Sequence, residues 1–167
     1  RALEDNADQI AKRENYVDYI ASRPRAQRRG SHALFTDTDD PLILSQIADA
    51  VAHHPGNIWL PIISLRREDA ARLGYDDAAQ WRELLTGFAP EMAEAMKIPV
   101  EQFRWYAAFH DEAHHPHLHM VCFSADGKSG YLTAEGIENI KAGLAKEIFR
   151  QELHELYGQQ TMRRNEL

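Results

Sequence analysis

The chain has 167 residues, 44% apolar and 27% charged, a composition typical of one folded domain of ordinary size. It has no apolar run near the ~20 residues of a membrane span, and its one cysteine, Cys122, excludes an internal disulfide and a zinc site built from several cysteines. The net charge of −7 argues against nucleic acid as a partner, whereas nine histidines, five of them between His110 and His119, argue for a metal site.

We therefore expect residues 1–167 to form a single domain. Because the chain starts at Arg1 without a methionine, we also expect it to be a fragment of a longer protein. The single cysteine fits a reducing compartment, and we expect the bacterial cytoplasm.

The first part of the chain is predicted to be mainly helical. Apolar residues recur at helical spacing over 4–22, and Pro24 ends this helix. Residues 32–36 are predicted to be a short strand or turn. A second helix is predicted to begin at Asp40, an N-cap residue, with Pro41 in the first helical position.

The rest of the chain mixes strands and helices. In order, we expect a strand over 57–65, a helix over 68–73 closed by Gly74, a helix from Asp76 to Met96 that Pro90 kinks or restarts, strands over 103–110 and 117–124 forming a hairpin, and a helix from Thr133 to about Tyr157. The predicted fold class is α+β, with a mainly antiparallel sheet flanked by helices.

The hairpin concentrates the histidines on one face. Because strand side chains alternate between faces, His110, His117 and His119 can meet, whereas the other face is continuously apolar. Three neutral imidazoles with open positions are typical of a catalytic site for a divalent metal ion, nominally Zn, Co, Ni, Cu or Mn rather than Mg. Asp111 or Glu112 could complete the ligand shell or orient a histidine. The alternative is a histidine-rich surface turn.

Two segments resemble a known family. His117-Leu118-His119, with a proline before it and His110-Asp111-Glu112 upstream, resembles the metal motif of HUH endonucleases, in particular of conjugative relaxases of the MobP class and their MobL-like relatives. The stretch over 15–24 resembles their tyrosine motif, and the segments over 59–70 and 124–130 are also similar to that family. The resemblance extends from about Asn15 to Leu167.

The resemblance implies an activity and a set of partners. Relaxases cut one strand of plasmid or transposon DNA at an origin of transfer, when a tyrosine hydroxyl attacks the scissile phosphate and stays linked to the 5′ phosphate. The family's metal ligands correspond to His110, His117 and His119, its tyrosine to Tyr19, and its fold to an HUH-like sheet. The implied cofactor is a divalent metal ion, Mn or Mg, with Zn, Co or Ni as alternatives. The implied partners are single-stranded or melted origin DNA, relaxosome accessory proteins and a coupling protein, without a membrane.

The choice between two tyrosines stays open. Tyr16 and Tyr19 lie three residues apart and share one side of the first helix, so their roles could be exchanged. Tyr19 is the predicted nucleophile, and Tyr16 is otherwise expected to pack against the sheet.

Arginines follow the tyrosine helix directly. Bidentate, permanently charged guanidinium groups suit phosphate contacts. The predicted DNA contacts are Arg23, Arg25, Arg28 and Arg29, extended by Arg66 with its neighbour Arg67 and by Lys128. We therefore expect a polarised surface, basic near Tyr19 and the histidines and acidic elsewhere. The alternative is that the arginines belong to a solvated loop.

Two other functions compete with a relaxase. One is a rolling-circle replication initiator of the HUH kind, although such initiators usually carry the tyrosine after the histidine motif. The other is a non-enzymatic, metal-stabilised DNA-binding domain.

Overall fold

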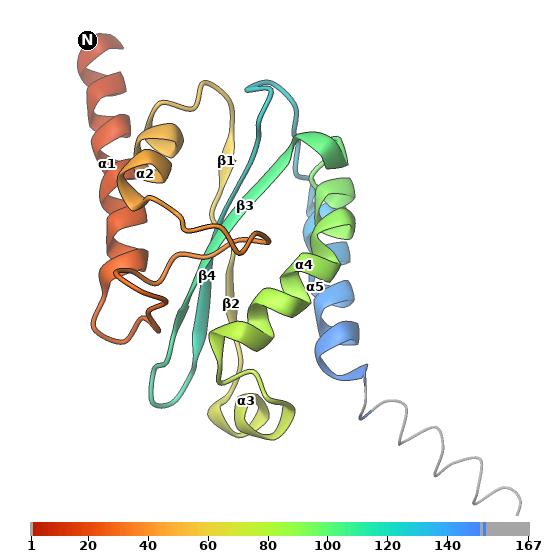
Figure 1. Ribbon diagram of the computed structural model, residues 1–167. Helices are drawn as coiled ribbons and strands as arrows, with labels where there is room; N and C mark the ends of the chain where they lie inside the picture. Colours follow the sequence, from red (N-terminus) through yellow and green to blue (C-terminus); the bar gives the residue numbers. More distant parts are fainter. Residues whose placement is uncertain (1, 151, 153–167) are drawn as a thin grey trace, which may run out of the picture.

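The computed structural model describes residues 2–150 and 152, which form three layers around one antiparallel sheet (Figure 1). Helices α1 (Ala2–Ser22) and α2 (Leu44–Ala52) lie on one side of the sheet, and α4 (Ala78–Ala95) and α5 (Ala134–Ile148) on the other. The short helix α3 (Arg67–Leu73) lies at one end of the sheet, and a 3-10 turn, η1 (Val100–Gln102), precedes β3. The predicted α+β class with a helix-flanked antiparallel sheet is confirmed.

Strand β4 (His117–Ser124) is the centre of the sheet. On one side it pairs with β3 (Phe103–His110), and on the other with β1 (Ile58–Trp59) and β2 (Ile62–Ser64), all antiparallel. Both hairpin strands have the predicted bounds. The register places His110 opposite His117 and Ala108 opposite His119, so these side chains share one face.

Each face of the sheet is covered by a separate apolar cluster. The face that carries Phe109 and Leu118 packs against α4, where Trp81 is fully buried. On the histidine face, Ala108 and Val121 pack against α1 and α2. The small Ala108 side chain suits a close approach of α1 to the sheet, and α1 carries both candidate tyrosines.

Two sequence predictions are wrong in detail. The strand expected over 57–65 is divided at Leu60-Pro61, because Pro61 has no N–H to give the ladder; its carbonyl still accepts from Met120 N at 2.9 Å. The second helix begins at Leu44 rather than Asp40. His32 Nε2 donates to the Leu42 carbonyl at 2.8 Å, and Ile43 is extended, which keeps the preceding segment out of the helix.

The remaining helix predictions agree more closely. The first helix, α1, has the predicted C-terminal end, and Gly74 closes α3 with a left-handed φ of 87°. Thr133 caps α5 by accepting from Gly136 N at 3.0 Å. Helix α4 continues through Pro90 and has Asp77, not Asp76, as its N-cap. The expected extension of the last helix to Tyr157 lies mostly outside the described residues.

In the part of the chain that the structure describes, no helix combines the length and the hydropathy needed to cross a bilayer.

Candidate metal and nucleophile site

Three histidines converge at one end of the β3–β4 hairpin. The ring centroids of His110 and His119 are 4.3 Å apart, and those of His117 and His119 are 6.3 Å apart. His110 is buried, with 1% of its surface exposed, whereas His117 and His119 are partly exposed. The site is therefore closed on the side of His110 and accessible on the side of His117.

The environment of His110 and His119 favours neutral imidazoles. Burial lowers the pKa of His110, and burial together with His110 and His117 lowers the pKa of His119 to about 4. A neutral imidazole keeps a nitrogen lone pair, which a metal ion requires. His110 Nε2 donates to the Ile20 carbonyl of α1 at 2.8 Å, which leaves Nδ1 as the nitrogen with a lone pair.

Both tyrosines of α1 lie beside the histidines. The Tyr16 hydroxyl is 3.4 Å from Nδ1 of His119, and burial raises the Tyr16 pKa. The Tyr19 ring centroid is 6.4 Å from that of His110, and 48% of the Tyr19 surface is exposed. The Arg23 guanidinium lies over the Tyr19 ring, 5.0 Å from its centroid. Tyr16 therefore packs against the sheet, as expected, and its hydroxyl also makes a polar contact with His119.

The loop between His110 and His117 engages arginines rather than histidines. Asp111 Oδ1 accepts from Arg67 Nη2 at 2.6 Å, and Glu112 Oε1 lies 3.8 Å from Arg23 Nη2. Neither carboxylate hydrogen-bonds to the imidazole ring of a hairpin histidine. Their geometry suits holding the loop in position more than completing a ligand shell.

Arg67 makes an unusual number of contacts with this loop. Its side chain donates to Asp111, to the Glu112 carbonyl, and to the Ala113 carbonyl at 3.1 Å, and its backbone N donates to the His114 carbonyl at 3.0 Å. The adjacent Arg66 is 71% exposed and pairs with Asp69 on its own helix. Sequence reasoning treated Arg66 and Arg67 as equivalent because they are neighbours. Their different partners depend on the path of the backbone from β2 into α3, which the sequence does not show.

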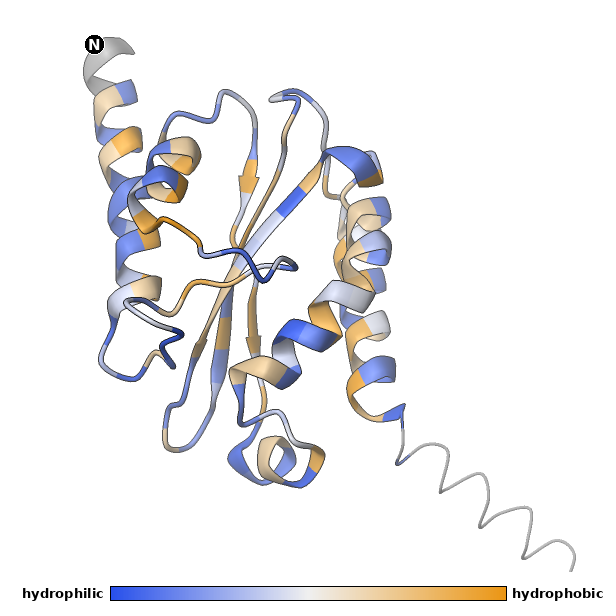
Figure 2. Ribbon diagram, viewed as in Figure 1, coloured by the Kyte–Doolittle hydropathy of each residue, from blue (hydrophilic) through white to orange (hydrophobic). Residues whose placement is uncertain are grey.

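The other predicted basic residues are spread along the molecule. Arg25, Arg28 and Arg29 are exposed in the hydrophilic loop that follows α1 (Figure 2), and Arg28 Nη1 donates to the Ser31 carbonyl at 3.1 Å. Arg25 is tied to the hairpin, because its carbonyl accepts from Asp111 N at 2.9 Å. Lys128 follows the other end of β4 from His117, so the structure does not bring it to the histidines.

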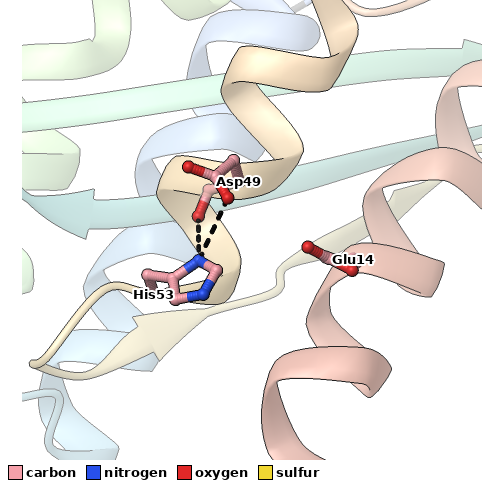
Figure 3. A group of neighbouring side chains, drawn as sticks. All are labelled: Glu14, Asp49 and His53. Carbon is pink, nitrogen blue, oxygen red and sulfur yellow. Dashed lines mark hydrogen bonds and ion pairs between the residues drawn. The ribbon is translucent and has the colours of Figure 1, made fainter. Parts of the chain in front are cut away.

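A second group of potential ligands joins α1 to α2. Among the described residues, Glu14, Asp49 and His53 are the group of three whose ligand atoms all lie within 4.8 Å of one another, a spacing that the hairpin histidines do not reach (Figure 3). Asp49 and His53 are largely exposed, and His53 Nδ1 lies 3.2 Å from Asp49 Oδ1. Exposed pairs of this kind are common without a metal, and only helix packing, which the sequence did not reveal, brings Glu14 to them.

Comparison with known families identifies the chain. A family model described as MobL relaxases matches residues 3–167. This chain belongs to the MobL relaxase family. The match spans α1, the arginine loop (residues 23–29) and the histidine hairpin of this MobL relaxase. It assigns the chain to the DNA-nicking enzymes of conjugation and mobilization. No curated protein and no solved structure matches the chain.

Proposed function

We propose that this MobL relaxase makes a site- and strand-specific nick at a plasmid or transposon origin of transfer by tyrosine transesterification. One observation carries the proposal: α1 holds two tyrosines against the face of the hairpin on which three histidines lie together. A nucleophile, candidate metal ligands and nearby arginines are the parts that transfer of a phosphodiester needs. The narrower assignments to the MobP class and the HUH superfamily remain predictions.

Tyr19 is the proposed nucleophile. Its half-exposed ring can be reached by a DNA strand, and Arg23 beside it can bind the incoming phosphate. In the step, the Tyr19 hydroxyl loses its proton and its oxygen forms a bond to phosphorus while the bond from phosphorus to the 3′ oxygen breaks. The released 3′ oxygen takes up a proton and becomes the 3′ hydroxyl. The resulting 5′-phosphotyrosine keeps the phosphodiester energy, so religation can reverse the reaction. The more buried Tyr16 is the alternative nucleophile.

The donor set fits a divalent metal ion. His110, His117 and His119 offer imidazole nitrogens on one face, and burial favours the neutral form of His110 and His119. The partial exposure of His117 leaves access for a phosphate oxygen. Rotation of the rings would have to bring their nitrogens closer together. A bound ion would polarise the scissile phosphate and stabilise its developing charge. Imidazole favours Mn, Zn, Co or Ni, whereas Mg would need additional oxygen ligands.

The proposed substrate is single-stranded or locally melted origin DNA. The arginine loop after α1 lies beside Tyr19 and would contact the backbone phosphates. Relaxosome accessory proteins, a coupling protein and a location in the bacterial cytoplasm remain predictions that accompany this role.

We expect Arg67→Met to lower the affinity for Mn²⁺ by roughly 10-fold or more, the lower end of the usual loss on removing a group that orients metal ligands. The reason is that Arg67 holds the loop between His110 and His117 through three side-chain bonds. Isothermal titration calorimetry with Mn²⁺ measures the effect. Arg66→Met is the matched control, because the exposed Arg66 side chain pairs with Asp69 instead of with that loop. Equal affinities in the two variants would contradict this role of Arg67.

The experiment that tests the proposed function uses labelled single-stranded oligonucleotides carrying the origin sequence, incubated with the protein and Mn²⁺ or Mg²⁺ and separated on a denaturing gel. The relaxase reading predicts a metal-dependent, shifted protein–DNA band together with a cut strand. Binding without any covalent band would favour the non-enzymatic DNA-binding domain. Cleavage confined to replication origins would favour the rolling-circle initiator.

A further inference from the structure

A cavity beside the tyrosine helix has no part in the reaction described above. It has a volume of about 410 Å³ and lies between α1, α2 and the segment that joins β1 to β2. Its lining consists of Gln9, Lys12, Arg13, Tyr16, Val51, Ile58 and Leu60. Tyr16 belongs both to this cavity and to the histidine face, because its hydroxyl is the group 3.4 Å from His119. The cavity is therefore a direct neighbour of the proposed reaction site.

The side of α1 that lines the cavity is cationic. At 100° per residue, Gln9, Lys12 and Arg13 lie within about 60° of Tyr16 around the helix axis. Glu14 and Asp18 fall on the opposite side of α1, where Glu14 approaches α2. Lys12 and Arg13 thus place two cationic groups in the lining of the cavity, and Arg13 Nη1 also donates to the His54 carbonyl at 2.9 Å.

One large apolar side chain, Leu60, is exposed on the opposite wall of the cavity, and Ile62 is exposed outside the cavity. Leu60 is 46% exposed and Ile62 is 58% exposed. Ile62 is the register partner of His119, so its side chain shares the histidine face. An exposed apolar side chain next to two cations suits a nucleotide, because the base offers a flat apolar face and the phosphate a negative charge.

We infer that this cavity binds the base of a nucleotide adjacent to the scissile phosphate in single-stranded DNA. Leu60 and Tyr16 contact the base, and Lys12 contacts the backbone phosphate. The strand then runs along α1, from the arginine loop past Tyr19 and the histidines towards Lys12. This inference rests on the proposed function, because that function puts the scissile phosphate at Tyr19, about one turn of α1 away from Tyr16.

The test compares two probes with the same backbone. Fluorescence anisotropy, with EDTA present to prevent cleavage, measures binding of an oligothymidylate and of an abasic sugar-phosphate oligomer of equal length. We expect Leu60→Ser to weaken binding of the oligothymidylate about 5-fold or more and to leave the abasic oligomer unchanged, because only the base contact is lost. Lys12→Gln is expected to weaken binding of both probes equally. It should also reduce the salt dependence of binding by about the amount that one phosphate contact contributes.

Matched controls and a gain-of-affinity variant complete the test. Val100→Ser removes another exposed apolar side chain, and Lys141→Gln removes another exposed lysine, both away from the cavity. Leu60→Trp should tighten binding of the oligothymidylate a few-fold, because indole stacks on a base over a larger area. The inference is overturned if Leu60→Ser behaves like Val100→Ser on both probes, or if Leu60→Trp has no effect.

The same proteins separate this inference from the proposed function. Formation of a covalent adduct with origin DNA by the wild type, together with no effect of Leu60→Ser, would overturn the cavity assignment alone. Base-dependent binding through Leu60 without any adduct would instead overturn the transesterification and leave the cavity as a DNA-binding site.

Discussion

Tyr19→Phe should abolish the covalent protein–DNA adduct, with a loss in the rate of strand cleavage of about 1,000-fold or more. The substitution removes only the attacking oxygen and keeps the ring that lies beside His110 and under Arg23. Binding of the uncleaved strand should therefore change little. Quenched-flow cleavage of a labelled origin oligonucleotide, with the adduct counted on a denaturing gel, measures both quantities.

Two further variants make this result specific. Tyr131→Phe is the control, because Tyr131 is 64% exposed and lies next to Lys97, away from the histidines. Tyr16→Phe should slow cleavage less than Tyr19→Phe does. The Tyr16 hydroxyl contacts His119, but it is more buried than Tyr19 and therefore less accessible to a DNA strand. If Tyr19→Phe still formed the full amount of adduct and Tyr16→Phe formed none, Tyr16 would be the nucleophile.

His119→Ala should remove metal-dependent cleavage and lower the affinity for Mn²⁺ by more than about 100-fold, beyond the usual effect of losing an orienting partner alone. His119 is the central member of the histidine group, with ring neighbours on both sides in His110 and His117. Titration with Mn²⁺ by calorimetry and cleavage assays over a range of Mn²⁺ concentrations measure the loss.

The same hairpin provides the control for that prediction. His115 is exposed in the loop of the hairpin, and His115→Ala keeps the three clustered histidines intact. If His119→Ala bound Mn²⁺ as tightly as His115→Ala, the metal would be bound elsewhere, and the group formed by Glu14, Asp49 and His53 would be the next site to examine.

The arrangement of the histidines was predictable because it depends on a local rule. Alternation along two strands, together with a short loop that fixes the register, placed His110, His117 and His119 on one face. The helical spacing of Tyr16 and Tyr19 likewise put both on one side of α1. These features need only the period of an element and the position of a turn.

Other features depend on packing between distant segments. The sequence could not show that α1 would lie on the histidine face, that Arg67 rather than Arg66 would reach the hairpin loop, or that Lys128 would follow the far end of β4. Arg23 lies over Tyr19, but the expected polarised surface as a whole stays a prediction. The division of the strand at Pro61 was visible as a proline, but its consequence depended on how β1 and β2 pair with β4.

The most direct test of the account is the identity of the residue that carries the DNA. The adduct formed with an origin oligonucleotide and Mn²⁺ is digested with nuclease and protease, and the modified peptide is sequenced by mass spectrometry. We predict a 5′-linked nucleotide on the Tyr19 side chain. A nucleotide on any other residue, or cleavage that leaves no modified peptide, would contradict the claim that Tyr19 attacks a phosphate held at the three histidines.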